Sequence, residues 1–446
     1  MEGLTDRPAF TPDRLDRPFA DPLAGRLFPP LRAGIDWGLE RTERALAELG
    51  DPHRAYATLH VGGTNGKGSV TSTVASIMRH SGRGAACYTS PHLCSFRERI
   101  LIDGLPFSED RLLEYAGQVV EPVVRFGLTF FEAITVLALH AFAHEGVEVA
   151  VMEVGLGGRL DATNVIRPEV SAVTNVAMDH ADYLGDTLAK IAREKGGIMK
   201  VGVPFVTAEE SPEILGIFQD MAATVGAPFG NVVPSGLGPV DVAADHTSLV
   251  LSTRSWGELE LRTPLVGHHQ ATNAALAVEM LEWLRPELKP EASAIVRGVA
   301  SVDYHGRDEV VRLEGRTWLF DVAHNTAGIL SLVDTIDRLD LPRPMVALVG
   351  VLGDKDWKSM LPQLLSRVDQ AILTQPPSAP PERRWDPDSA AEQIESKTGV
   401  RVVEDFVDAV SEARDRAGNG TVVVTGSVHT VGCAMSLLGL DPLGRL

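Results

Sequence analysis

The stretch from Leu59 to Ser69, which reads L-H-V-G-G-T-N-G-K-G-S, constrains this chain more than any other. An apolar run precedes its small residues and a helix-like pattern follows them, so we expect a strand, a loop and a helix. Glycines in such a loop let backbone N–H groups converge on an anion, and the helix N-terminus adds positive potential. The sequence therefore predicts a phosphate-binding loop formed by Gly63, Thr64, Asn65, Gly66, Lys67, Gly68 and Ser69.

Two side chains of this loop carry specific expectations. Lys67 would contact the β- and γ-phosphates of a nucleotide, and the hydroxyl of Ser69 would ligate Mg²⁺. The spacing departs from the common phosphate-loop pattern, because Gly68 separates the lysine from the serine and only three residues separate Gly62 from Gly66.

Composition limits the classes of protein to which the chain can belong. Its 446 residues exceed one ordinary core, which favours about two or three domains. No apolar run approaches the roughly 20 residues that span a bilayer, and the polar start of the chain has no signal-peptide core. Three separated cysteines without a C-x-x-C pair indicate a reduced cytoplasm, and not a disulfide scaffold or a zinc site. A formal net charge of −19 argues against nucleic-acid binding, so cations for an acidic ligand must be concentrated locally.

Apolar periodicity predicts the surrounding elements. In the first part of the chain we expect helices over 35–49, 129–143, 187–200, 267–277 and 292–300, strands over 85–89, 147–154 and 170–176, and a hairpin from 248–253 and 257–263. Later, strands over 318–322, 345–351, 370–374, 400–404 and 421–425 alternate with helical segments. Such alternation predicts a mostly parallel sheet, and the absence of G-x-G-x-x-G after a strand argues against a dinucleotide site.

Two polar residues follow predicted strands beside the phosphate loop. Glu153 lies at the end of a valine-rich strand, where a nucleotide-bound metal needs an oxygen ligand. Considered alone, such a glutamate is more often a capping or salt-bridged residue. His180 follows the next strand and lies in the same layer if the sheet is parallel, although a lone histidine is more often structural.

Several motifs together resemble the folylpolyglutamate synthase/dihydrofolate synthase family of the Mur ligase superfamily. They are G-T-N-G-K-G-S, S-P-H-L-C-S-F-R-E-R-I, E-V-G-L-G-G-R-L-D-A-T-N, F-D-V-A-H-N and V-T-G-S-V-H-T-V-G. The resemblance implies an α/β fold of two domains. The first, 1–299, would be a P-loop ATP-binding domain with folate-binding loops, and the second, 300–446, a Rossmann-like glutamate-ligase domain with a mostly parallel sheet.

The resemblance also assigns residues of the first domain. Ser69, Glu153 and His180 would hold Mg²⁺ at two sites, although a histidine ligand is unusual for magnesium. Lys195 would react with CO₂ to form a carbamate, which requires a neutral amine and hence a lowered pKa. Asn273 would contact the adenine region, with Gln270 as a second candidate.

A loop and a helix would bind the folate substrate. The resemblance makes Ser90, His92, Phe96 and Arg99 candidates for the substrate loop. Glu132, near the start of an apolar helix, either lines the pterin pocket or interacts favourably with the helix dipole, and the sequence leaves both readings open.

In the second domain the matching motifs indicate four further residues. Arg307 would reach the ATP phosphates, although His305 stands where the family usually has proline. Asp321 would hold the ribose, while His324 and Ser427 would serve the incoming glutamate. His429 stands where the family often has an aromatic residue, and Lys355 is expected to be structural or a weak phosphate contact.

These residues predict an ATP-dependent ligase that joins L-glutamate to a folate-type carboxylate through an acyl phosphate, with Lys67, Lys195, Arg307 and His324 as the catalytic residues. Dihydropteroate and reduced folates both stay open as substrates. Two alternatives remain: an amide ligase of the same superfamily that acts on another acid, and a non-catalytic nucleotide-binding module. We expect a cytoplasmic monomer that binds neither nucleic acid nor membrane.

Overall fold

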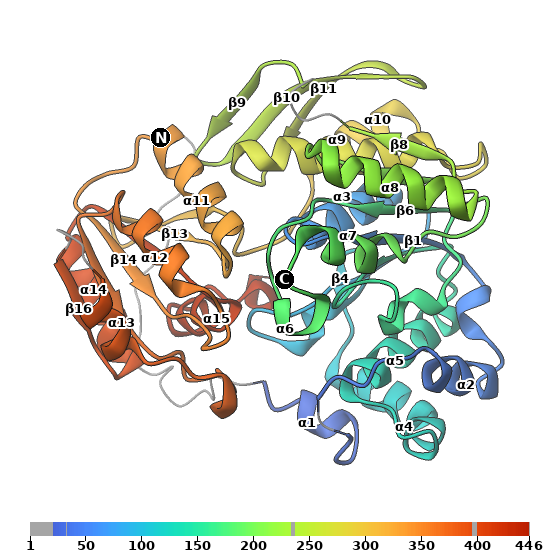
Figure 1. Cartoon of the computed structure of the whole chain (residues 1–446), viewed down its shortest axis with the longest axis horizontal. Coiled ribbons are helices and arrows are strands. Elements are labelled where there is room, and N and C mark those ends of the chain that lie inside the picture. Colours follow the sequence, from blue (N-terminus) through green and yellow to red (C-terminus); the bar gives the residue numbers. More distant parts are fainter. Residues whose placement is uncertain (1–20, 33, 233–236, 395–398, 446) are drawn as a thin grey trace.

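An eight-stranded sheet organises the first part of the chain, in the computed structural model that describes residues 21–32, 34–232, 237–394 and 399–445 (Figure 1). Its strand order is β4-β3-β2-β5-β1-β6-β7-β8, and β3 and β4 alone join it in antiparallel fashion. The strands are β1 (Ala57–Gly62), β2 (Ala85–Tyr88), β3 (Ile100–Ile102), β4 (Leu105–Pro106), β5 (Val149–Glu153), β6 (Val170–Val173), β7 (Phe205–Thr207) and β8 (Phe229–Asn231).

The central strand β1 determines where the polar residues of this lobe lie. It pairs in parallel with β5 and β6, and the register places Val61 opposite Glu153 and Gly62 opposite Val173. Because parallel strands end at the same edge of a sheet, the loops that follow β1, β5 and β6 meet there.

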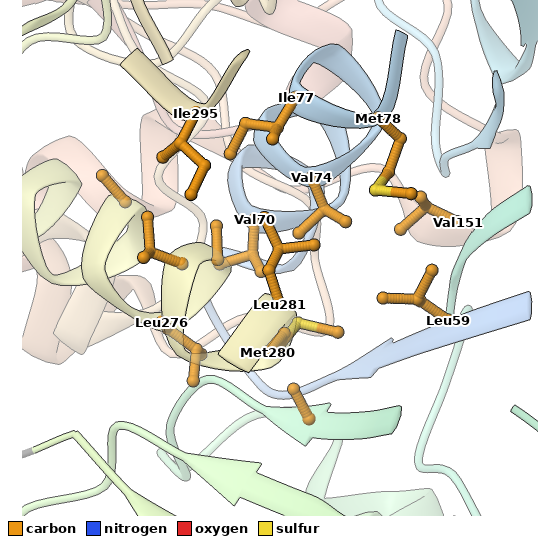
Figure 2. Close-up of a cluster of buried hydrophobic side chains, with 14 of the residues drawn as sticks. Leu59, Val70, Val74, Ile77, Met78, Val151, Leu276, Met280, Leu281 and Ile295 are labelled. Atoms are coloured by element: carbon orange, nitrogen blue, oxygen red, sulfur yellow. The ribbon is translucent and has the colours of Figure 1, made fainter. Parts of the chain in front are cut away.

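Helices cover this sheet and supply its core. They are α1 (Ala24–Leu27), α2 (Glu40–Glu48), α3 (Lys67–His80), α4 (Glu109–Arg125), α5 (Phe130–His144), α6 (Ala181–Leu184), α7 (Leu188–Gly196), α8 (Pro212–Val225), α9 (His268–Glu282) and α10 (Ala292–Ala300). Figure 2 shows α3 with Val70, Val74 and Ile77 directed into a cluster that α9 and α10 complete. The apolar residues of α3 are buried around most of its circumference, which fixes the helix that follows the phosphate loop.

A small antiparallel sheet connects the two lobes along one side of α9 (Figure 1). It contains β9 (Val240–Ala243), β10 (His246–Thr253) and β11 (Gly257–Thr263). The predicted hairpin over 248–253 and 257–263 is confirmed, and β10 begins two residues earlier than expected.

The second lobe contains a six-stranded sheet of order β12-β13-β17-β14-β15-β16, in which only β12 is antiparallel. Its elements are β12 (Glu309–Leu313), β13 (Arg316–Phe320), α11 (Thr326–Arg338), β14 (Met345–Val349), α12 (Trp357–Leu365), β15 (Gln370–Leu373), α13 (Pro387–Gln393), β16 (Gly399–Val402), α14 (Phe406–Ala417), β17 (Thr421–Thr425) and α15 (Val428–Leu437). The mostly parallel sheet predicted for the second domain is therefore confirmed.

The structure corrects two local expectations. The helix expected from residue 35 begins only at Glu40, and Ile35 precedes it as an exposed residue (46%). Strand β12 was not predicted, because it pairs through a short turn at one edge of the sheet and not through a helical crossover. Among the described residues, no helix has the length and apolarity needed to cross a bilayer.

Candidate active site

A cavity of about 190 Å³ lies between the two lobes, at the edge where β1, β5 and β13 end. Most of the residues singled out from the sequence line it. From the first lobe come Gly63, Thr64, Asn65, Gly66, Lys67, Gly68, Ser69, Ser90, Glu153, His180, Lys195, Gln270 and Asn273, and from the second come Arg307, Asp321 and His324. Residues that lie far apart in the sequence thus share one cleft, which we call the interlobe cleft.

The phosphate loop leads directly into α3. Gly66 is the residue before the helix, has φ 84° and makes no side-chain capping bond, so N–H groups of the first turn are left for an anion. A Cβ atom at Gly66 would lie 2.5 Å from Asn273 Oδ1, so the close approach of α9 also requires glycine. Asn273 is oriented by Gln270, whose Oε1 accepts from its Nδ2 at 2.9 Å. Lys67 Nζ donates to the Thr64 carbonyl at 3.1 Å and stays beside the loop.

Three residues of the first lobe fit a magnesium ion held jointly with phosphate. The hydroxyl of Ser69 is buried and has no hydrogen-bond partner among the described residues. Glu153 is buried, and one of its oxygens accepts from the Ser90 N–H at 2.9 Å. Burial raises the pKa of Glu153, against the positive charge of Lys67, so a bound cation would stabilise its carboxylate.

His180 has a different environment from Glu153. It adopts φ 52° before α6, and burial lowers its pKa to about 4, so it is a neutral imidazole. Within the described parts of the chain, neither residue belongs to a group of three His, Cys, Asp or Glu ligand atoms within 4.8 Å of one another. The protein thus offers only part of a coordination shell, as expected for Mg²⁺ completed by phosphate and water.

Lys195 is a buried lysine, 4% exposed, on the last turn of α7. Its Nζ donates to the Gly63 carbonyl at 2.7 Å, directly behind the phosphate loop. Burial, with help from the charge of Lys67, lowers its pKa to about 7. A substantial fraction of this amine is therefore neutral near pH 7, which is the form that reacts with CO₂.

The wall of the cleft formed by the second lobe contains Arg307 and Asp321. Arg307 Nη2 donates to the Tyr304 hydroxyl at 3.1 Å, and the guanidinium lies over the Tyr304 ring at 4.8 Å. Asp321 follows β13, and its two oxygens accept from the backbone N–H groups of Ala323 at 2.8 Å and Asp308 at 3.0 Å. The His305–Arg307 segment therefore places the Arg307 guanidinium in the cleft without the proline that the family usually has.

Asp179 connects the two lobes, and the sequence analysis did not single it out. Its Oδ1 lies 2.5 Å from Lys355 Nζ, and its Oδ2 lies 3.2 Å from His324 Nε2 and accepts from Asn325 Nδ2 at 3.1 Å. Burial acts to raise the pKa of Asp179, but the His324 hydrogen bond and the Lys355 charge hold it well below its usual range. Its position directly before His180 was the one signal in the sequence that could have identified Asp179 as a site residue. No local pattern indicates its contacts with the second lobe.

Asn65 and Asn325 form the second connection across the cleft. Each amide donates to the other, at 3.1 Å from Asn65 and 3.0 Å from Asn325. These hydrogen bonds connect the phosphate loop to the segment that carries His324, so they fix the position of the loop relative to the second lobe.

A second cavity, of about 270 Å³, lies beside the cleft and shares Ser90, Pro91, Gly155 and Leu156 with it. Three residues that the sequence analysis assigned to the substrate line this cavity: Ser90, Arg99 and Glu132. Phe131 and Trp37 add aromatic surface. We call it the side pocket.

Glu132 fulfils its expected helix role and also lines the side pocket. Its carboxylate accepts from the backbone N–H of Thr129 at 2.7 Å in a capping box at the start of α5, and Arg41 Nη2 binds it at 2.9 Å. The two readings left open by the sequence are therefore compatible in this structure.

Three other predicted substrate residues have structural contacts and line none of the cavities described here. Phe96 is fully buried in the core. His92 accepts from Arg99 Nε at 2.9 Å, and burial lowers its pKa to about 3. Ser427 caps α15 and donates to the Gly350 carbonyl at 2.9 Å. Direct ligand contact by these three side chains stays a prediction from the resemblance.

Comparison with known proteins agrees with this arrangement. A family model for the Mur ligase middle domain matches residues 61–281, and one for the Mur ligase glutamate ligase domain matches residues 306–428. The structure of Mycobacterium tuberculosis folylpolyglutamate synthase complexed with ADP matches with a TM-score of 0.84 and 33% identity, covering 92% of this chain and 96% of that one.

Two curated relatives define the relationship further. The chain is 34% identical over 430 residues to a probable bifunctional folylpolyglutamate synthase/dihydropteroate synthase of Haloferax volcanii, and spans about half of that protein (49%) and 91% of its own length. It is 30% identical over 416 residues to the dihydrofolate synthase/folylpolyglutamate synthase of Bacillus subtilis, covering 90% of this chain and 95% of that protein. Because this match extends over nearly all of both proteins, the chain belongs to the folylpolyglutamate synthase/dihydrofolate synthase family of Mur ligases.

Proposed function

We propose that this protein is an ATP-dependent ligase that joins L-glutamate to the carboxylate of a folate-type acid. The observation that carries the proposal is the junction of two cavities. The interlobe cleft has the phosphate loop, and the side pocket has aromatic walls and a buried carboxylate. Because Ser90 and Gly155 line both, an acid bound in the side pocket reaches the cleft with its carboxylate near the phosphates.

The first half-reaction is transfer of the γ-phosphoryl group to that carboxylate, which gives an acyl phosphate and ADP. The first turn of α3 and Lys67 contact the phosphates from one side, and Arg307 contacts them from the other. Phosphoryl transfer depends mainly on positioning and on charge neutralisation, which both sides of the cleft supply. The contacts of Asp179 and Asn65 with the second lobe hold the two sides together.

Magnesium fits the first-lobe side of this arrangement. Ser69, Glu153 and His180 would hold it at two sites, and when bound it would neutralise phosphate charge and orient the γ-phosphoryl group. A carbamate on Lys195 would add an anion behind the phosphate loop, where the neutral amine now contacts Gly63.

In the second half-reaction the amine of glutamate attacks the acyl carbon, and phosphate leaves. His324, at the second-lobe side of the cleft, is held by Asp179 and is the candidate for contact with glutamate. We place the domain division between residues 299 and 300, at the last residue of α10, and expect the enzyme to act as a cytoplasmic monomer.

The test is product formation by the purified chain with ATP, Mg²⁺, bicarbonate and glutamate. Dihydropteroate and tetrahydrofolate are supplied in separate reactions, and products are identified by mass. An added glutamyl residue on either acid supports the proposal, and the pair of results assigns one or both activities. Omission of glutamate should nearly abolish ADP release, and rapid ADP release without any amine would contradict coupled ligation.

A further inference from the structure

Tyr304 contacts a residue from each side of the interlobe cleft, and the proposed reaction gives it no role. It belongs to the connection between α10 and β12 and is half-buried. Its hydroxyl accepts a hydrogen bond from Arg307 Nη2 at 3.1 Å, and the Arg307 guanidinium lies over its ring, 4.8 Å from the ring centroid. Burial raises the pKa of Tyr304 above its usual value, so the hydroxyl that receives this hydrogen bond is neutral.

The second contact of Tyr304 is with the phosphate loop at Gly68. A Cβ atom at this position would lie 1.9 Å from Tyr304 Oη and 2.4 Å from its Cζ. Gly68 is the second residue of α3, where the helical backbone tolerates a side chain, so it is the Tyr304 ring that requires glycine here. The glycine that separates Lys67 from Ser69 therefore leaves room for an aromatic ring from the start of the second lobe.

Arg307 depends on Tyr304 for its position. In the described parts of the chain Arg307 forms no ion pair, and its other hydrogen bond runs from Nη1 to the carbonyl of its neighbour Gly306 at 3.0 Å. A separate cavity of about 290 Å³ is lined by both Tyr304 and Arg307, so close packing does not enclose either side chain. Arg307 and Lys67 line the same cleft, and their like charges repel until an anion binds. Among the described residues, Tyr304 is thus the one side chain that holds this guanidinium by a hydrogen bond.

We propose that Tyr304 is a positioning residue for phosphoryl transfer, which holds the Arg307 guanidinium beside the first turn of α3 so that both lobes contact the same phosphate chain. The inference deepens the proposed function, on which it rests. The hydroxyl fixes one end of the guanidinium, and the ring fixes its plane, because a cation is attracted to an aromatic face. An arginine held in this way has little freedom left to lose when the nucleotide binds, so its charge is already in place for the transition state.

Two variants separate the contributions of the hydroxyl and the ring. Tyr304→Phe removes the hydroxyl and keeps the ring, and kcat/KM for ATP in the ligation reaction should fall about tenfold, as expected for a lost hydrogen bond to a charged group. Tyr304→Leu also removes the aromatic face and should lower kcat/KM by about a further threefold. Melting temperatures establish that both variants are folded.

A double-mutant cycle with Arg307 shows whether Tyr304 acts through it. In the Arg307→Ala background the hydrogen bond is already absent, so Tyr304→Phe should cause a further loss of less than about twofold. The cycle is measured by kcat/KM and also by calorimetric binding of a non-hydrolysable ATP analogue, so that it does not require an active double variant.

Gly68→Ala perturbs Tyr304 from its other partner. Its methyl group would occupy the position of the Tyr304 hydroxyl, so it should lower kcat/KM at least as much as Tyr304→Phe, and much less in a Tyr304→Ala background. The matched control is Tyr115→Phe in α4, because Arg111 Nη2 donates to the Tyr115 hydroxyl at 2.8 Å and the guanidinium lies 4.6 Å over its ring. Tyr115 lines none of the cavities described here, and this variant should change kcat/KM by less than about twofold.

Each outcome decides the inference. An unchanged kcat/KM in folded Tyr304→Phe overturns it. An equal loss from Tyr304→Phe with and without Arg307 would show that Tyr304 only supports the local fold, and this also overturns it. If the wild-type protein ligates neither dihydropteroate nor tetrahydrofolate, the proposed function fails, while the binding cycle with the ATP analogue still tests the coupling of Tyr304 to Arg307 separately.

Discussion

The two walls of the interlobe cleft use their polar groups differently. The first-lobe wall consists of Gly63–Ser69, Glu153 and Lys195, and it keeps donors and acceptors available: the Ser69 hydroxyl has no partner among the described residues and the N-terminus of α3 has no side-chain cap. The second-lobe wall contains Arg307, Asp321 and His324, with Lys355 beside it, and these groups are already engaged. His324 and Lys355 both contact Asp179 of the first lobe.

This difference indicates a division of work. The first-lobe wall is arranged for a phosphate before any ligand arrives. The second-lobe wall holds the lobes together, and the same contacts with the first lobe fix the positions of its side chains. Changes in the first wall should therefore reduce turnover with little effect on stability. Changes in the second wall should alter lobe association as well as turnover.

The largest effect is expected at Lys67. Lys67→Ala removes the only lysine of the phosphate loop, and kcat/KM for ATP should fall about 1000-fold, because charge stabilisation dominates phosphoryl transfer. The melting temperature should change little, since Lys67 Nζ has only the Thr64 carbonyl as a hydrogen-bond partner in the described structure. Lys190→Ala, which removes an exposed lysine paired with Asp186, is the matched control. A loss of less than about tenfold would show that the loop does not act on phosphate as proposed.

Lys355 tests the second wall. Its side chain is only 6% exposed and pairs with Asp179, so Lys355→Met leaves a buried carboxylate short of its counter-charge. Breaking such a pair should lower the free energy of unfolding by about 3 kcal/mol, measured by chemical denaturation, and should raise KM for ATP. Lys358→Met, three residues later and exposed, should do neither. If both variants behave alike, the Asp179 contact does not hold the lobes together and the contrast between the walls is lost.

Lys195 shows whether the first wall is complete without modification. The neutral amine is the reactive form, and its pKa of about 7 makes that form increase as the pH rises through neutrality. Activity of CO₂-depleted protein should therefore recover on addition of bicarbonate, and more fully above pH 7 than below it. Lys195→Met should lose about 10- to 100-fold in activity and should not respond to bicarbonate.

The same experiment has a direct structural readout. Native mass spectrometry of the active protein should detect a carbamate that disappears in Lys195→Met. An unmodified Lys195 in fully active protein with metals bound would remove the carbamate from the mechanism and leave the amine as a structural donor to Gly63.

The sequence could predict residues at strand ends but not the contacts between lobes. Glu153 and His180 were placed correctly near the phosphate loop, because β5 and β6 both pair in parallel with β1 and parallel strands end at the same edge of a sheet. The Asp179–Lys355 pair joins residues 176 positions apart, on loops that follow strands of two different sheets. No periodicity or spacing in the sequence encodes such a contact. The sequence therefore could not predict that side chains of the second lobe already contact Asp179.

Local misreadings have equally physical causes. Ile35 fitted a helical period, but it lies before α2 and lines the side pocket, where its side chain is exposed and belongs to no core. Phe96 was a substrate-loop candidate by resemblance to the family motif; its ring is buried against Phe130 at 6.3 Å between centroids, and its contact with substrate stays a prediction. A motif identifies which residues matter, and packing decides which of them face the cavity.

The smallest expected effect concerns His305, which precedes the second wall where the family usually has proline. Its Nε2 lies 2.8 Å from Asp303 Oδ1 and its Nδ1 lies 3.1 Å from Glu309 Oε1. Burial acts to lower its pKa, but these two carboxylates outweigh burial and raise the pKa to about 9. The folded state therefore prefers the charged imidazolium, whose stabilisation is complete below the ordinary value of 6.5 and is lost as the pH rises through about 9.

Because the Asp303 side chain is 71% exposed, the contribution should be modest, at roughly 1 kcal/mol. Wild-type protein should lose that much more unfolding free energy between pH 6.5 and about 9 than His305→Gln, which cannot carry the charge. Arg307 lies two residues after His305, so the same loss should slightly raise KM for ATP in the wild-type protein alone. Parallel pH profiles of stability and KM in both proteins would show that the charge at His305 does not support the second wall.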